Sequence, residues 1–183
     1  HFMTDMTNHA IDWVNFQQAL TPDKPFFIYF APGATHAPHH VPKDWADKYK
    51  GKFDAGWDVL REETFARQKK LGVIPADTVL TPRPDDVPSW DSMPEAFKPV
   101  LRRQMEVYAG FLEFTDHHVG RLFDVINNLG LADDTLIYYI IGDNGASAEG
   151  SFNGCYNEMS YFNGLQALET AEYLTERMDK LGG

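Results

Sequence analysis

The longest patterned stretch of the chain repeats its apolar positions with the period of a helix. Between about residues 99 and 128, apolar or small side chains recur at steps of three and four, which places them on one helical stripe: Met105, Tyr108, Leu112, Thr115, Val119, Leu122, Ile126 and Leu129. Pro99 suits the first turn of such a helix and Gly130 suits its C-terminal stop. Weaker patterns predict further helices over residues 4–20, 43–50, 57–71 and 167–181.

Two short apolar runs are typical of buried strands. Residues 26–30 read FFIYF, and residues 135–141 read TLIYYII. The second run follows the long predicted helix after a short turn at Asp133 and Asp134, which is the order of a helix–strand unit in a parallel sheet. The pattern therefore predicts an α/β fold with helices flanking a mainly parallel sheet.

The segment from residue 73 to residue 94 is expected to be irregular. It contains five prolines, at positions 75, 82, 84, 88 and 94, and these prevent regular structure over most of its length. A long irregular segment inside a compact domain is usually functional or wraps a surface. We find no internal repeat and no domain boundary, so residues 1–183 are expected to form one domain.

Composition narrows the function classes only moderately. The chain of 183 residues is 43% hydrophobic, which suits a domain with a real core, and its formal net charge is −11. It has no basic stripe, which argues against nucleic-acid binding, and no apolar run near the roughly 18 residues of a membrane span. The lone Cys155 cannot form an internal disulfide and is expected to be a small packed side chain. The compartment stays open, between periplasm or secretion and the cytoplasm.

Polar side chains with useful chemistry follow both predicted strands. Asp143 and Asn144 lie between Gly142 and Gly145, directly after the second strand, and His36 follows the first. A carboxylate and an amide carbonyl are the hard oxygen donors that Ca²⁺ or Mg²⁺ prefers. If the strands are parallel neighbours, both loops open at the same edge of the sheet. The alternative is an ordinary turn, because Asp, Asn and Gly are common turn residues.

The other candidate residues carry weaker signals. His36, His39 and His40 suggest zinc, but they lie in a proline-interrupted loop with no cysteine or second ligand set beside them. His39 and His40 are expected to be solvated loop side chains. Glu149 lies six residues after Asp143 and is interpreted as a loop carboxylate rather than a site residue. In the long helix, His117 and His118 are expected on the exposed face.

Three ordered blocks of the sequence resemble a known family. They are KPFFIYFAPGATHAP at residues 24–38, the stretch from Tyr108 through Asp116 to Val119 and Gly120, and DTLIYYIIGDNG at residues 134–145. The chain is similar there to the sulfatases, and within them to bacterial-type arylsulfatases of the alkaline-phosphatase-like superfamily. The resemblance implies the mixed, mainly parallel sheet of that superfamily.

The resemblance also implies roles for individual residues. Asp143 and Asn144 match a pair that binds a divalent cation, usually Ca²⁺, with Mg²⁺ as the other candidate. His36 matches a histidine that contacts the sulfate and its departing oxygen. The nucleophile of the family is a formylglycine made from the cysteine of a Cys-x-Pro-x-Arg motif, and its hydrate attacks sulfur while the cation steadies the charge.

The chain departs from the family pattern at the nucleophile. No Cys-x-Pro-x-Arg occurs, since Cys155 is followed by Tyr-Asn-Glu. The segment resembles the middle of a sulfatase, so we expect a parent enzyme that hydrolyses small-molecule aryl sulfates, and a chain that is inactive alone. A sheet that lacks its first strand also predicts an oligomer, or a partner chain that completes the sheet.

Two other functions remain open at this point. The first is a phosphodiesterase or phosphonate monoester hydrolase of the same superfamily, which would share the metal loop and the histidine. The second is a non-catalytic cation-binding remnant, which would bind Ca²⁺ without turnover. The residue at the nucleophile position and the relative rates on sulfate and phosphate esters would separate them.

Overall fold

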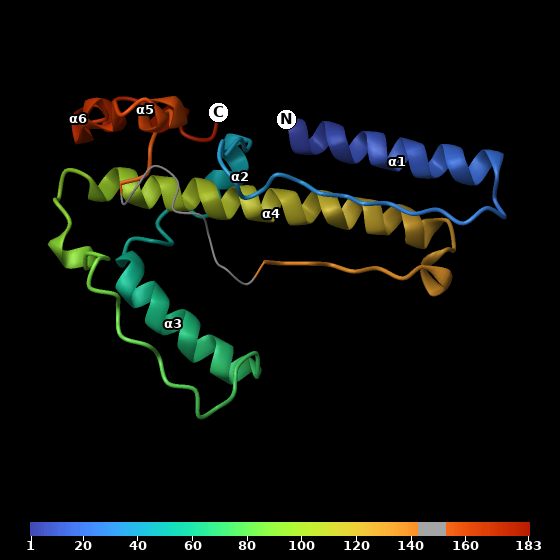
Figure 1. Ribbon diagram of the computed structural model, residues 1–183, viewed down its shortest axis with the longest axis horizontal. Helices are drawn as coiled ribbons and strands as arrows, with labels where there is room; N and C mark the ends of the chain where they lie inside the picture. The colour runs from blue at the N-terminus through green and yellow to red at the C-terminus, as the bar shows by residue number, and fades with distance from the viewer. Residues whose placement is uncertain (143–152) are drawn as a thin grey trace.

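The computed structural model describes residues 1–142 and 153–183, and long helices dominate it (Figure 1). Its α-helices are α1 (Phe2–Leu20), α2 (Lys43–Asp47), α3 (Gly56–Leu71), α4 (Lys98–Asn128), α5 (Glu158–Phe162) and α6 (Ala171–Thr175). Short 3₁₀ turns are η1 (Trp90–Ser92), η2 (Ala132–Asp134), η3 (Gln166–Leu168) and η4 (Met178–Lys180). The helices predicted before residue 130 are confirmed. The single helix predicted over residues 167–181 is wrong, because that segment is divided between η3, α6 and η4.

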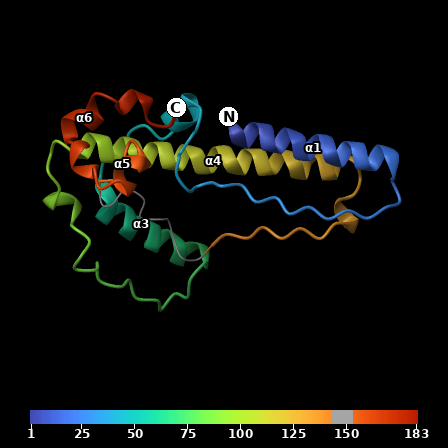
Figure 2. The ribbon, with the colours of Figure 1, turned by 45° about the horizontal axis from the view of Figure 1, so that its top comes forward.

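Helix α4 is the central element against which the rest of the chain packs. In Figures 1 and 2, α1 lies along its C-terminal half, and α2 lies beside its middle. The main core cluster joins these elements and consists of Met3, Val41, Ala46, Val107, Phe111, Phe114 and Val119. Within the described residues, no helix is long and apolar enough to cross a membrane.

Burial on α4 covers a wider face than the predicted stripe. Thr115, Val119, Leu122 and Ile126 are buried as expected, but Leu112 is 53% exposed. Phe111 and Phe114 are buried instead, because α1 and α2 approach the helix from more than one side. The 3–4 spacing located the helix but not every inward position.

The predicted α/β sheet is wrong for this structure, because residues 1–142 and 153–183 contain no strand. Residues 26–30 and 135–141 run extended alongside α4, in the same direction as each other (Figures 1 and 2). Phe27 and Tyr29 are 86% and 84% exposed, while Phe26, Ile28 and Phe30 are half-buried. Burial along residues 26–30 therefore alternates with the period of two that is typical of a strand. A strand also needs a neighbouring strand that accepts from its N–H groups and donates to its C=O groups, and neither segment has one among the described residues.

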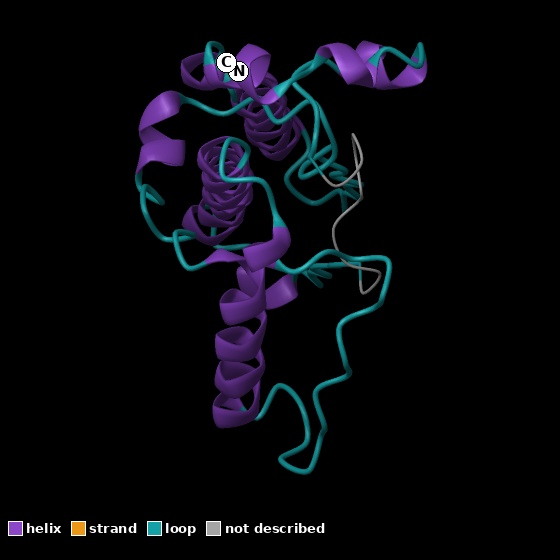
Figure 3. Cartoon of the chain, turned by 90° about the vertical axis from the view of Figure 1, so that its left-hand side faces the viewer, coloured by secondary structure: helices purple, strands orange, loops and turns teal. Residues whose placement is uncertain are grey.

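Helix α3 extends away from α4 and carries the proline-rich segment along its side (Figure 3). That segment is irregular, as predicted, except for η1. Its end is held by Asp58, whose carboxylate accepts from the Trp90 backbone N–H at 2.8 Å and from Arg83 at 3.0 Å. These contacts hold the pKa of Asp58 below its usual value, the Trp90 N–H most of all. A second core cluster forms here from Trp90, Met93 and Leu101, flanked by Trp57 and Phe97.

His118 is buried between α1 and α4, so its predicted exposure is wrong, whereas His117 is exposed as expected. Arg121 Nη1 lies 2.9 Å from His118 Nδ1, and because a guanidinium can only donate, Nδ1 accepts. The proton is therefore on Nε2, which donates to Thr4 Oγ1 at 3.0 Å. Burial lowers the pKa of His118 below its usual value, and the charges of Arg121 and His117 act in the same direction.

Candidate functional site

His36 lies in a tight turn that orients its imidazole. Its backbone N–H donates to the Gly33 carbonyl at 2.9 Å, and its side chain is exposed. Nδ1 lies 2.8 Å from the Ala37 carbonyl oxygen, which can only accept, so Nδ1 carries the proton. The lone pair of the neutral ring is therefore on Nε2. A histidine held in one tautomer by its own loop is suited to accept or donate a proton at the other nitrogen.

The loop around His36 is tied to α4 through its neighbours. Thr35 Oγ1 donates to the Tyr108 hydroxyl at 2.7 Å. His39 donates from Nε2 to the Thr35 carbonyl at 3.1 Å, and its ring meets Tyr108 edge-on with centroids 5.4 Å apart. His39 is thus a half-buried structural residue rather than the solvated side chain that the sequence indicated, while His40 is exposed as expected.

A close helix contact fixes the far end of the same loop. Helix α2 begins directly after Pro42 and lies against α4 at Gly110. A Cβ atom at position 110 would lie 2.7 Å from Ala46 Cα, so only glycine permits this approach. The His36 loop is therefore held between residues 26–30, which run along α4, and a helix that touches α4 directly.

The predicted metal ligands Asp143 and Asn144 lie outside the described residues, as does Glu149. The segment that leads to them is described as far as Gly142. Tyr139 packs edge-on near Phe123 of α4, with ring centroids 6.4 Å apart, and its hydroxyl lies 3.4 Å from Asp116 Oδ1. Residues 26–30 and 135–141, which lead to His36 and toward Asp143, run alongside α4 in the same direction as each other and opposite to that of α4 (Figure 1).

In residues 1–142 and 153–183, no group of three or more His, Cys, Asp or Glu side chains is placed to hold a metal ion. His36, His39 and His40 are adjacent in sequence, but they do not gather into a ligand set. The assignment of Asp143 and Asn144 as ligands of a divalent cation therefore stays a prediction.

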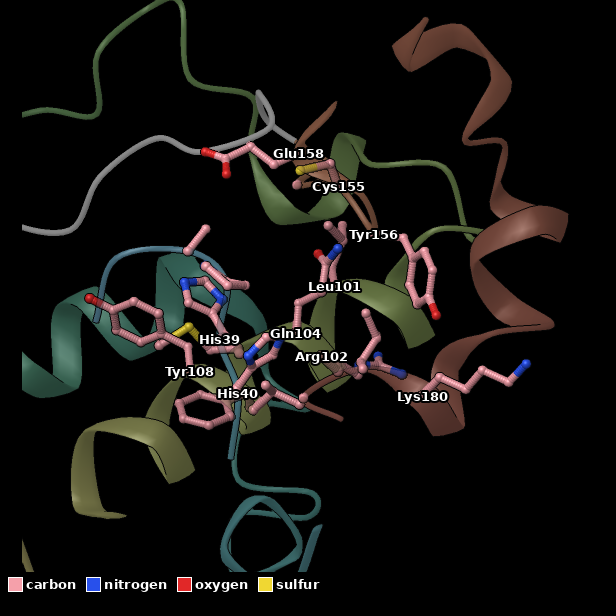
Figure 4. A pocket seen from close by; sticks show the side chains of 18 of the residues that line it. His39, His40, Leu101, Arg102, Gln104, Tyr108, Cys155, Tyr156, Glu158 and Lys180 are labelled. Carbon is pink, nitrogen blue, oxygen red and sulfur yellow. The ribbon is translucent and has the colours of Figure 1, made fainter. Parts of the chain in front are cut away.

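A cavity of ≈ 570 Å³ opens beside the His36 loop (Figure 4). It lies between α4, the start of α3, residues 37–40 and the C-terminal segment, and Cys155 is part of its wall. Arg102 and Gln104, on α4, also line it. Neither residue was singled out from the sequence, because polar residues on a helix are usually solvated and nothing local marks these two as inward.

Comparison with known proteins decides the family. A sequence model of the family described as Sulfatase matches residues 1–175. The chain is similar to an uncharacterized sulfatase of Schizosaccharomyces pombe, at 39% identity over 129 residues, which is 69% of this chain. It is also similar to an arylsulfatase of Klebsiella aerogenes, at 28% identity over 135 residues, which is 74% of this chain. This chain belongs to the sulfatase family.

Membership in the sulfatase family makes the chain part of a hydrolase family, as the sequence motifs predicted. The chain covers 22% of the length of the Schizosaccharomyces pombe relative and 29% of the Klebsiella aerogenes arylsulfatase. It therefore spans less than a third of these sulfatases. The match extends through the His36 loop, α4 and the segment that leads to Asp143, which are the parts that carried the resemblance.

Proposed function

We propose that this chain is the central part of a calcium-dependent arylsulfatase and supplies it with one proton-transferring histidine and two metal ligands. The substrate is a small-molecule aryl sulfate ester. The formylglycine nucleophile and the remaining metal ligands belong to parts of the enzyme outside this sequence, which has no Cys-x-Pro-x-Arg motif. The orientation of the His36 ring is the observation that best supports this proposal.

His36 has the geometry needed for a general acid. The Ala37 carbonyl holds the proton on Nδ1, so Nε2 is the nitrogen that gains and loses a proton. Histidine titrates near neutral pH, and a protonated Nε2 can donate to the oxygen that departs from sulfur. The His36 side chain is exposed, as a residue that meets a substrate must be.

Asp143 and Asn144 are the residues proposed to hold Ca²⁺, or Mg²⁺. Ca²⁺ takes six to eight oxygen ligands, so this pair alone should bind it weakly. When bound, the cation would stabilise negative charge on the sulfate oxygens. This chain then supplies two of the ligands, which lie between Gly142 and Gly145 in the sequence.

The proposal is tested in the complete polypeptide that contains both this chain and a Cys-x-Pro-x-Arg motif. His36→Ala should lower kcat for 4-nitrophenyl sulfate by about 10²-fold or more, because general acid catalysis contributes about 10²–10⁴-fold. His9→Ala is the matched control, since His9 is an exposed histidine on α1, paired only with Asp5 at 3.8 Å among the contacts of the described residues. An unchanged rate for His36→Ala would remove that residue from the site.

The metal assignment and the competing functions have separate readouts. Asp143→Ala should weaken Ca²⁺ binding by the complete polypeptide, and unchanged affinity would make the assignment wrong. Faster hydrolysis of phosphate than of sulfate esters would favour the phosphodiesterase or phosphonate hydrolase. Calcium binding by the complete polypeptide without turnover of either ester would favour the non-catalytic remnant. The 183-residue chain alone should not hydrolyse the ester, and turnover by it would refute the proposed division of the site.

A further inference from the structure

Thr35, the residue before His36, is held from two sides. Its hydroxyl donates to the Tyr108 hydroxyl at 2.7 Å, and its carbonyl accepts from His39 Nε2 at 3.1 Å. The His39 ring in turn meets Tyr108 edge-on, with centroids 5.4 Å apart, and Figure 4 shows the two rings side by side. Tyr108, Thr35 and His39 therefore form a closed set of contacts between α4 and the His36 loop.

Helix α4 gives this set of contacts a fixed anchor. Tyr108 lies in α4 close to Gly110, where α2 touches the helix directly. His39 also packs against Phe111 of the same helix, with ring centroids 6.1 Å apart, and Phe111 is buried in the main core cluster. Since interiors are close-packed and yield little, the position of Thr35 is set by the core rather than by the loop itself.

Both polar groups of the peptide that joins Thr35 to His36 are hydrogen-bonded. Its carbonyl, from Thr35, accepts from His39, and its N–H, from His36, donates to the Gly33 carbonyl at 2.9 Å. A rotation of this planar peptide group would break both hydrogen bonds. The direction in which the His36 side chain leaves the backbone depends on the same group. The alignment of His36 Nδ1 with the Ala37 carbonyl, at 2.8 Å, therefore depends on it as well.

We propose that Tyr108 and His39 are positioning residues for His36. Through Thr35 they hold the Thr35–His36 peptide group so that the imidazole keeps Nδ1 on the Ala37 carbonyl and leaves Nε2 for proton transfer. Their importance for turnover rests on the proposed role of His36 as a general acid, whereas their effect on the ring does not. Positioning matters because a displacement of about 1 Å at a catalytic group can cost about 10²-fold in rate.

The first test removes single hydroxyl groups in the complete polypeptide and measures turnover of 4-nitrophenyl sulfate. Tyr108→Phe keeps the ring against His39 and removes only the acceptor of the Thr35 hydroxyl, so kcat should fall about 3–10-fold, the worth of one hydrogen bond. Thr35→Val should lower kcat by a similar factor, whereas Thr35→Ser keeps the hydroxyl and should keep most of the rate. Tyr161→Phe is the matched control and should not change the rate, since Tyr161 is exposed on α5 and its ring contacts Phe162.

The His36→Ala background separates positioning from a general loss of stability. Tyr108→Phe should cause no further loss of kcat there, because its effect passes through the imidazole. An equal loss with and without His36 would overturn the positioning role. If His36→Ala lowers kcat but neither Tyr108→Phe nor Thr35→Val does, the positioning role is wrong and the proposed function stands. If His36→Ala itself leaves kcat unchanged, the proposed function is wrong.

A second readout needs no turnover. Nitrogen-15 NMR of the histidine rings, recorded on the 183-residue chain at alkaline pH where histidine is neutral, reports which ring nitrogen carries the proton. His36 should have its proton on Nδ1 in the unmodified chain and in Tyr161→Phe, and should become a mixture of both tautomers in Tyr108→Phe. Thr35→Val makes the same test from the loop side, so the result does not depend on one variant folding. A His36 ring that stays unchanged in these variants would overturn the positioning role, whatever the activity of the enzyme.

Discussion

Helices α2 and α4 approach each other so closely at Gly110 that a single methyl group should separate them. A Cβ atom at this position would lie 2.7 Å from both the Cα and the N of Ala46 and 2.9 Å from the Trp45 carbonyl carbon. Ordinary carbon contacts are about 3.5–4.0 Å, so Gly110→Ala requires the two backbones to move apart by about 1 Å. The clash involves backbone atoms, which cannot rotate away as a long side chain could.

The magnitude follows from two opposing terms. Overpacking of this kind costs about 1–3 kcal/mol, and replacing a helical glycine by alanine gains up to about 1 kcal/mol. Gly110→Ala should therefore lower the free energy of unfolding by up to about 2 kcal/mol. Gly120 is the internal control, because it lies in the same helix and nothing is within 4 Å of its added Cβ. Gly120→Ala should raise the free energy of unfolding by up to about 1 kcal/mol.

Urea unfolding of the three proteins, followed by helical circular dichroism, measures both changes. Opposite shifts of the midpoint for the two glycines would support the close approach of α2 and α4. If Gly110→Ala were as stabilising as Gly120→Ala, α2 and α4 could not approach each other as closely as described. The argument that α2 helps to hold the His36 loop against α4 would then be wrong as well. If Gly110→Ala gave no folded protein while Gly120→Ala folded, the steric argument would stand with a larger cost.

Three further predictions concern the same packing. Folding lowers the pKa of His118, so as the pH falls the unfolded chain binds a proton at this imidazole before the folded chain does. The free energy of unfolding should therefore decrease as the pH drops below the ordinary histidine value of 6.5. His118→Gln should reduce this pH dependence in unfolding curves measured at a series of pH values. Glu106→Leu should cost about 1–3 kcal/mol in urea unfolding, because it leaves the Gly51 N–H, now 2.9 Å from Glu106, without this acceptor, while the half-buried Arg103 keeps Asp47 at 2.9 Å; Lys48→Met, which removes an exposed pair, should cost at most about 1 kcal/mol. The exposed apolar side chains of the two extended segments should drive self-association, and light scattering that showed a monomer at all concentrations would contradict this.

The sequence predicted the helices best where the signal was local. The 3–4 spacing and the terminal Pro99 and Gly130 located α4, and the same reasoning located α1, α2 and α3. The inward face of α4 was predicted less accurately, since Leu112 is exposed and Phe111 is buried. Which side of a helix is buried depends on the neighbours that reach it, and those neighbours come from residues far away in sequence.

The strand prediction went wrong for a related reason. The runs at residues 26–30 and 135–141 have the composition of strands and adopt extended backbone, but the residues described here offer them no hydrogen-bonding neighbour. Extended conformation is a local property, whereas a sheet is a relation between segments. The cavity lined by Gln104 and Arg102 likewise depends on how α4 packs against the chain near Gly154, and the spacing of apolar residues along the sequence does not predict it.

The sequence by itself determined the family, the order of its motifs and the candidate chemistry of His36, Asp143 and Asn144, because these depend on residue type and spacing along the chain. Only the tertiary structure decided which His36 nitrogen carries the proton and that His39 and His118 are packed. The His36 tautomer depends on how the folded loop places the neighbouring Ala37 carbonyl, and burial depends on contacts between distant residues. They exist only once the chain has folded.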